Sequence, residues 1–146
     1  MAASKKSKAA EHRQAMPQRV LVVEDDAILA LAIEEALHEA GIDEVELTAS
    51  TNAALESLRR ERPEAVVLDV HLADRDDGWA IAELLRTLGP DRPQIVFSTG
   101  APDAIPDDIA ELGTVLAKPY ETDTLVALLR EPQRKGILSR LRGALG

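Results

Sequence analysis

Short runs of consecutive apolar residues recur along the chain, and polar residues follow each run. Runs cover residues 19–23, 65–68, 94–98 and 114–117, and a run with some alternation covers 45–48. Unbroken apolar runs of this length are typical of strands buried on both faces, as at the centre of a parallel sheet. The alternation in 45–48 instead predicts a strand at the edge of the sheet.

Segments with helical spacing of apolar residues separate these runs. The spacing and its stop signals predict helices over 28–37 up to Gly41, from Ser50 or Thr51 to Arg60, over 79–88, near Pro106, and over 122–130. Strand and helix therefore alternate five times. This pattern predicts an α/β fold, with a doubly wound parallel sheet, right-handed crossovers and helices on both faces.

The two ends of the chain depart from this pattern. Residues 1–18 are rich in Ala, Lys and Ser, so we expect a disordered basic leader before a domain over 19–131. After Pro132, residues 132–146 combine helically spaced apolar residues with basic ones, which predicts a basic amphipathic tail. A partner helix, a membrane-surface anchor and a frayed end all fit this tail. Its apolar stripe is small for firm membrane binding, so we favour partner contact or disorder.

Composition and charge argue against several classes of function for this chain. The 146 residues are 45% hydrophobic but only 2% aromatic, which predicts one globular domain with an aliphatic core. The net charge of −9 combines +4 in residues 1–19, +4 in residues 132–146 and −17 between them. Such an acidic domain is not suited to nucleic acid. The chain has no cysteine, and it shows neither a secretory signal nor an apolar stretch of membrane-spanning length, so we expect a cytoplasmic protein.

Polar residues whose side chains could bind a ligand or react gather where the predicted strands end. They are Glu24, Asp25, Asp26, Asp69, Thr99 and Lys118. The carboxyl ends of parallel strands share one edge of the sheet, so we expect these groups to converge, although Asp26 fits a helix cap better than a metal ligand. Clustered carboxylates suit Mg²⁺, and a nearby lysine and hydroxyl suit a phosphoryl group that an aspartate can accept.

Motifs in this order resemble the receiver domains of two-component response regulators. The matching stretches are VLVVEDD at 20–26, VVLDV at 66–70, DG at 77–78, STG at 98–100 and AKP at 117–119. The resemblance covers about residues 19–131. It implies a flavodoxin-like five-stranded sheet in the strand order 2-1-3-4-5.

The resemblance also implies a role for each strand-end residue. Asp69 would be the phosphoacceptor. Glu24 and Asp25 would hold Mg²⁺ together with Asp69 and the backbone carbonyl of His71, and Glu24 could act through water. In addition, Thr99 and Lys118 would contact the phosphoryl group, and the bond between Lys118 and Pro119 is typically cis in this family.

Two departures from the family pattern bear on how a signal leaves the site. The segment between Thr99 and Lys118 is short and interrupted by Pro102 and Pro106, which predicts a stubby helix there. Val115 occupies the position, three residues before Lys118, where receivers usually carry a switch aromatic. The stretch from Phe97 to Gly100 partly resembles the Phe-Ala-Thr-Gly motif of stand-alone receivers in alphaproteobacterial stress signalling, with Ser98 in place of alanine. Ala73 stands where most receivers have proline.

Taken together, the residues and the resemblance predict a monomeric, single-domain response regulator. A histidine kinase or a phosphotransfer protein would donate its phosphoryl group to Asp69, and a protein contact or onward relay would carry the signal. We expect no enzymatic turnover beyond self-catalysed phosphotransfer and dephosphorylation. The alternative is a receiver-like module that docks on a kinase or another signalling partner without being phosphorylated. A third hypothesis, a phosphatase or phosphotransferase acting on small molecules, lacks a cap domain or substrate segment to support it.

Overall fold

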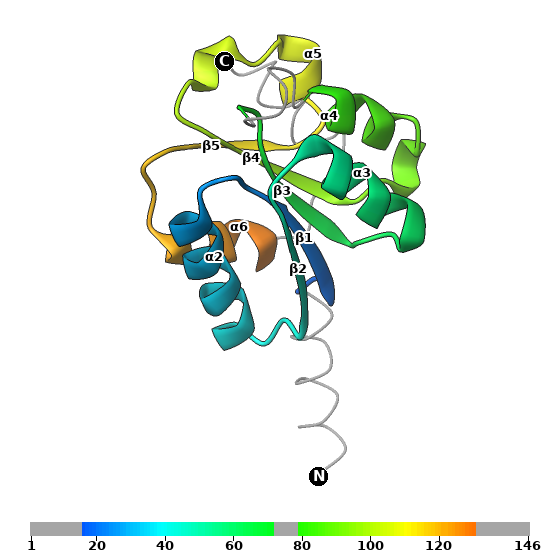
Figure 1. Ribbon diagram of the computed structural model, residues 1–146. Coiled ribbons are helices and arrows are strands. Elements are labelled where there is room, and N and C mark those ends of the chain that lie inside the picture. Colours follow the sequence, from blue (N-terminus) through cyan, green and yellow to red (C-terminus); the bar gives the residue numbers. More distant parts are fainter. Residues whose placement is uncertain (1–15, 72–78, 131–146) are drawn as a thin grey trace, which may run out of the picture.

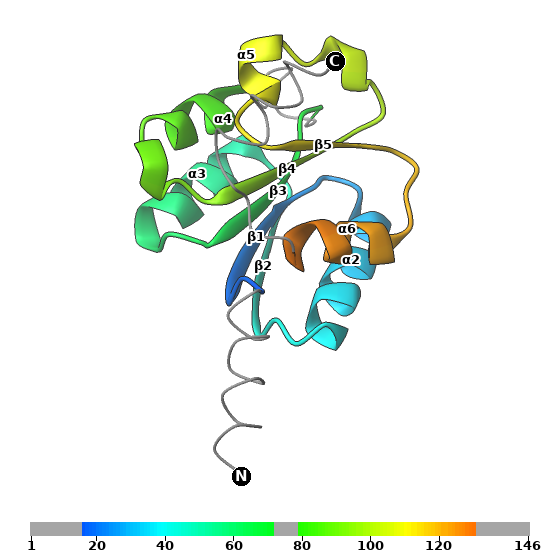
Figure 2. The same cartoon turned by 180° about the vertical axis from the view of Figure 1, so that it is seen from behind.

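The computed structural model describes residues 16–71 and 79–130, and it shows a central sheet with helices on both faces (Figures 1 and 2). The strands are β1 (Arg19–Val23), β2 (Glu44–Thr48), β3 (Ala65–Asp69), β4 (Gln94–Thr99) and β5 (Thr114–Ala117). The helices are α2 (Ala27–Glu39), α3 (Thr51–Arg60), α4 (Trp79–Arg86), α5 (Asp107–Ala110) and α6 (Thr122–Arg130), with 3₁₀ turns η1 (Gly89–Asp91) and η2 (Pro102–Ala104).

All five strands are parallel and lie in the order β2-β1-β3-β4-β5. The predicted doubly wound α/β fold and its strand order are thus confirmed. Every residue of β3, the middle strand, is buried, which agrees with its unbroken apolar sequence. The edge strand β2 is only partly buried, in agreement with its alternating pattern.

Two apolar layers hold the helices against the sheet. Helices α3, α4 and α5 pack on one face, where Val66, Leu68 and Phe97 contribute from the sheet. Helices α2 and α6 pack on the other face, where Val67 and Val96 contribute. Neighbouring residues of a strand point to opposite faces, so a continuous apolar run supplies both layers.

The helix ends follow local chemistry. Asp26 caps α2, because its side chain accepts hydrogen bonds from the backbone N–H groups of Ile28 and Leu29, as the sequence predicted. Ser50, rather than Thr51, caps α3 through Ala53 N–H. Gly41 follows α2 with φ of 97°, a conformation that favours glycine.

Helix α4 is shorter than the sequence predicted. The prediction of a helix to Leu88 was wrong by two residues, since α4 ends at Arg86. Thr87 and Leu88 N–H groups bond to the carbonyl oxygens of Leu84 and Leu85, three residues back. These tighter bonds lead into η1, where Pro90 cannot continue an α-helix.

The predicted leader (1–18) and tail (132–146) fall largely or wholly outside the described residues, as does Ala73. Within residues 16–71 and 79–130, no helix combines the length and the apolar character needed to cross a membrane.

Candidate functional site

The carboxyl ends of β1 and β3 place three carboxylates side by side. Asp69 is the last residue of β3 and is 4% exposed. Glu24 follows β1 and is 3% exposed. Its N–H group donates to Thr48 O at 2.9 Å and so extends the pairing with β2. Asp25 comes next and is exposed. The apolar strands thus hold two carboxylates out of water and leave the third open to it.

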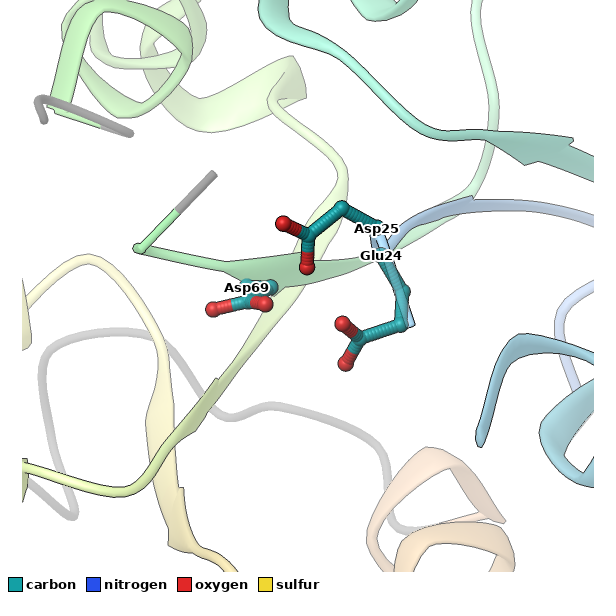
Figure 3. Close-up of side chains that lie close together, drawn as sticks. All are labelled: Glu24, Asp25 and Asp69. Carbon is teal, nitrogen blue, oxygen red and sulfur yellow. The ribbon is translucent and has the colours of Figure 1, made fainter. Parts of the chain in front are cut away.

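The three carboxylates face a common space (Figure 3). One oxygen from each of Glu24, Asp25 and Asp69 lies within 4.8 Å of the other two. Such a set of oxygen ligands fits a hard divalent cation like Mg²⁺, which favours carboxylates and retains several waters.

Lys118 brings a positive charge to this cluster from the end of β5. Its Nζ lies 2.7 Å from Glu24 Oε1 and 3.4 Å from Asp69 Oδ2. The Lys118–Pro119 bond is cis, as the resemblance implied. The N–H group of Lys118 also donates to Thr99 O at 2.7 Å, so the start of the Lys118 loop stays attached to β4.

Among the residues that the structure describes, one ammonium group faces three carboxylates and does not balance their charge. Burial raises the pKa of Glu24, the contact with Asp69 raises it further, and the hydrogen bond from Lys118 only partly opposes them. Burial alone would lower the pKa of Lys118, but the hydrogen bond to Glu24 and the charge of Asp69 outweigh it and raise the pKa. The cluster therefore has an excess of negative charge, which a divalent cation would neutralise.

Thr99 belongs to the site by position, but its side chain has another partner. It is buried at the end of β4, and its Oγ1 accepts a hydrogen bond from Ala101 N–H at 3.0 Å. Alternation along β4 directs Ser98 to the same face as Asp69 and Thr99 to the opposite face. The structure thus brings Glu24, Asp25, Asp69 and Lys118 together and leaves the Thr99 hydroxyl bonded to its own loop.

His71 begins the loop that follows Asp69. Its N–H group donates to Asp69 Oδ1 at 2.9 Å, which fixes one oxygen of that carboxylate. The role predicted for its carbonyl oxygen, as a metal ligand, stays a prediction.

The sequence analysis missed Tyr120 as a member of this region. Its hydroxyl shares a hydrogen bond of 2.8 Å with Ser98 Oγ. Burial raises the pKa of Tyr120 although the bond with Ser98 opposes this, so the hydroxyl is protonated at neutral pH. The sequence offered one signal that Tyr120 belongs to this region: it is the only tyrosine in the chain, and it lies two residues after Lys118.

Comparison with known proteins agrees with this geometry. The family model described as the response regulator receiver domain matches residues 20–130. Response regulator MprA of Mycolicibacterium vanbaalenii is 35% identical over 124 residues, which make up 82% of this chain and 52% of that protein. The chain thus spans about half the length of the curated relatives it matches.

Solved receiver structures are also similar. A CheY-like receiver domain from Methylobacillus flagellatus has 27% identity and a TM-score of 0.68, covering 77% of this chain and 96% of that one. A response regulator from Burkholderia pseudomallei, solved with a phosphorylated aspartic acid, a calcium ion and citrate, has 25% identity and a TM-score of 0.66. That match covers 88% of this chain and 74% of the other. The PhyR stress response regulator has 26% identity and a TM-score of 0.66, covering 88% of this chain and 52% of its own.

The acidic cluster of Glu24, Asp25 and Asp69 corresponds to the acidic pocket of receiver domains. Fold, strand order and family model agree over the same residues. The chain therefore belongs to the response regulator receiver domain family of two-component signalling.

Proposed function

We propose that this chain accepts a phosphoryl group on Asp69 from a phosphohistidine of a histidine kinase or a phosphotransfer protein. The observation that carries the proposal is the placement of the buried Asp69 carboxylate between a lysine ammonium group and two further carboxylates. In the transfer, an oxygen of Asp69 attacks phosphorus and forms an O–P bond. The N–P bond of the donor breaks, and its electron pair returns to the imidazole.

The cofactor in this proposal is Mg²⁺. Glu24, Asp25, Asp69 and the carbonyl oxygen of His71 would hold it, with Glu24 acting directly or through water. When bound, Mg²⁺ neutralises the negative charge that gathers on the phosphoryl oxygens. The excess of carboxylates over ammonium groups in the cluster supports this assignment.

Lys118 and Thr99 would respond to the phosphoryl group. Lys118 Nζ is 2.7 Å from Glu24 but 3.4 Å from Asp69, so a more negative group on Asp69 would draw it away from Glu24. The Thr99 hydroxyl would give up its bond with Ala101 N–H to reach the same group. These new contacts exist only in the phosphorylated state, as a two-state signal requires.

The signal would leave through the Thr99 loop and residues 101–112. Val115 packs partly buried on the α3–α5 side of the sheet, and it offers no aromatic ring for the usual relay. The hydrogen bond from Lys118 N–H to Thr99 O links the two responding residues directly. A protein contact, or onward phosphoryl transfer in the cytoplasm, would then be the output of the proposed monomer.

The first test is phosphorylation by acetyl phosphate with Mg²⁺, followed by intact-mass measurement. We expect the wild-type chain to gain one phosphoryl group, Asp69→Asn to gain none, and chelation of Mg²⁺ to prevent the gain. Beryllofluoride with Mg²⁺ should shift the amide signals around Asp69 and Thr99. An unmodified wild-type chain with unchanged amide signals would refute the proposal.

The rival function is docking without phosphorylation, which the absence of an aromatic at Val115 favours. Asp69→Asn distinguishes the two in cells. If this variant supports the signalling response as well as the wild type does, phosphotransfer is not the function.

A further inference from the structure

Tyr120 and Ser98 form a partly buried polar contact close to Asp69 in the sheet. Their hydroxyl oxygens are 2.8 Å apart, and Ser98 is 1% exposed. The Tyr120 ring packs partly buried against the apolar layer under α2 and α6. The hydroxyl of Tyr120 thus satisfies the buried hydroxyl of Ser98, which would be costly to leave unpaired.

The sheet register places this contact beside the acceptor carboxylate. Ser98 is the direct register partner of Asp69 in the β3–β4 pair, and both side chains point to the face covered by α2 and α6. Tyr120 lies two residues after Lys118 in the loop between β5 and α6. The contact therefore joins the strand beside Asp69 to the loop that carries the lysine.

Two bonds bracket Lys118 on this loop. At Lys118 itself, the backbone N–H group donates to Thr99 O at 2.7 Å. Two residues further along the chain, the Tyr120 hydroxyl is hydrogen-bonded to Ser98. A lysine side chain is long and flexible, so the position of its ammonium group depends on how firmly its backbone is held. Lys118 Nζ lies 3.4 Å from Asp69 Oδ2. A small displacement of the loop would therefore decide whether Nζ contacts this carboxylate.

We propose that the hydrogen bond between Tyr120 and Ser98 is a positioning contact, which holds the loop after β5 so that Lys118 reaches the phosphoryl group on Asp69. Tyr120 and Ser98 act through Lys118 and are not catalytic residues. The inference rests on the proposed function, because Lys118 has a phosphoryl group to stabilise only if Asp69 is an acceptor.

The test compares Tyr120→Phe, Ser98→Ala and the double variant in phosphorylation by acetyl phosphate at saturating Mg²⁺. The Tyr120→Phe change removes the hydroxyl but keeps the ring in the apolar layer. We expect each single variant to be phosphorylated about threefold to tenfold more slowly, which is the effect of losing one hydrogen bond. The double variant should be no slower than the single ones, because all three lack the same bond.

The affinity for Mg²⁺, followed by the fluorescence of the single tryptophan, should stay unchanged in these variants, since none of the proposed ligands is altered. Thr48→Val is the matched control. The change removes a buried hydroxyl bond, 3.1 Å to Val22 O, on β2 away from the Lys118 loop. It keeps the backbone carbonyl oxygen of Thr48 that accepts a hydrogen bond from Glu24 N–H. We expect this control to be phosphorylated at the wild-type rate.

A second readout needs neither metal nor phosphoryl group. In the metal-free protein, the ¹³Cε signal of Lys118, assigned with Lys118→Arg, should shift in Tyr120→Phe and not in Thr48→Val. Wild-type rates and an unmoved Lys118 signal in Tyr120→Phe would overturn the positioning role alone. Equal slowing in Thr48→Val would overturn it too. A wild-type chain that accepts no phosphoryl group would instead overturn the proposed function, and the inference with it.

Discussion

Glu24 is the residue at which burial and charge conflict most directly. Its carboxylate is almost fully removed from water and faces Asp69, yet within residues 16–71 and 79–130 it pairs with a single ammonium group, shared with Asp69. Its second oxygen, Oε2, accepts a hydrogen bond from Asp26 N–H at 3.1 Å. The raised pKa of Glu24 shows that these partners do not fully offset the loss of hydration. A binding site can retain such a residue because its ligand removes the conflict.

The raised pKa predicts how stability depends on pH in the metal-free protein. A carboxyl group whose pKa is higher in the folded state stabilises the fold below its unfolded pKa, and this contribution is lost as pH rises through the folded pKa. We therefore expect Glu24→Gln, which stays neutral, to be more stable than wild type at pH 7. Its stability should also decline less as pH rises above the ordinary value for glutamate.

Thermal unfolding in the presence of a chelator, at a series of pH values, checks this expectation. Glu34→Gln is the control, since Glu34 lies on α2 outside the cluster. A Glu24→Gln variant less stable than wild type at pH 7 would show that the Lys118 pair outweighs burial.

At the scale of elements, a close backbone approach fixes how α5 leads into β5. A Cβ atom built on Gly113 would lie 2.2 Å from Ile95 O and 2.8 Å from Ile95 Cβ. Ile95 is fully buried in β4, so neither strand can move aside easily. The short α5 segment thus reaches the sheet only because residue 113 has no side chain.

Gly113→Ala should therefore destabilise the domain by about 1–3 kcal/mol through overpacking. Urea unfolding followed by circular dichroism measures the change. Gly100→Ala is a matched control, because nothing lies within 4 Å of the added Cβ, and its effect should stay within about 0.5 kcal/mol. Equal stability of the two variants would mean that the β4–β5 region yields to the extra methyl group.

At the scale of the whole molecule, the described members of the two apolar layers come from most of the length of residues 16–130. The layer under α2 and α6 reaches from Met16 and Val20 to Leu129, and the layer under α3, α4 and α5 lies between these limits. Met16 lies before the predicted start of the domain at residue 19, and the boundaries at 19–131 stay a prediction.

A chain cut to residues 16–130 should consequently unfold in one cooperative transition. We expect its free energy of unfolding to equal that of the full chain within about 0.5 kcal/mol, because the shorter chain keeps every described member of the two apolar layers. Denaturant unfolding of both chains provides the comparison. A larger loss would show that residues outside this range contribute to the fold. Signalling by the same two chains would decide whether the basic tail at 132–146 matters for output.

Much of the architecture was determined by sequence alone. The apolar runs and helical spacings predicted all five strands and their helices, because burial on two faces leaves a local pattern of side chains. The motifs around Asp69 and Lys118 predicted which strand ends would meet. The short α5 was also predicted, since Pro102 and Pro106 restrict the segment before it.

Only the tertiary structure decided which atoms pair across those strand ends. Lys118 and Glu24 are 94 positions apart, and Lys118 and Asp69 are 49 apart, so their distances depend on sheet register. The contact of Tyr120 with Ser98, 22 positions apart, also depends on how the strands pair. Local patterns specify the face and the end of a strand on which a residue lies. Several carboxylate oxygens lie within reach of the Lys118 ammonium group. Packing between strands that are distant in sequence decides which of these oxygens the ammonium group contacts.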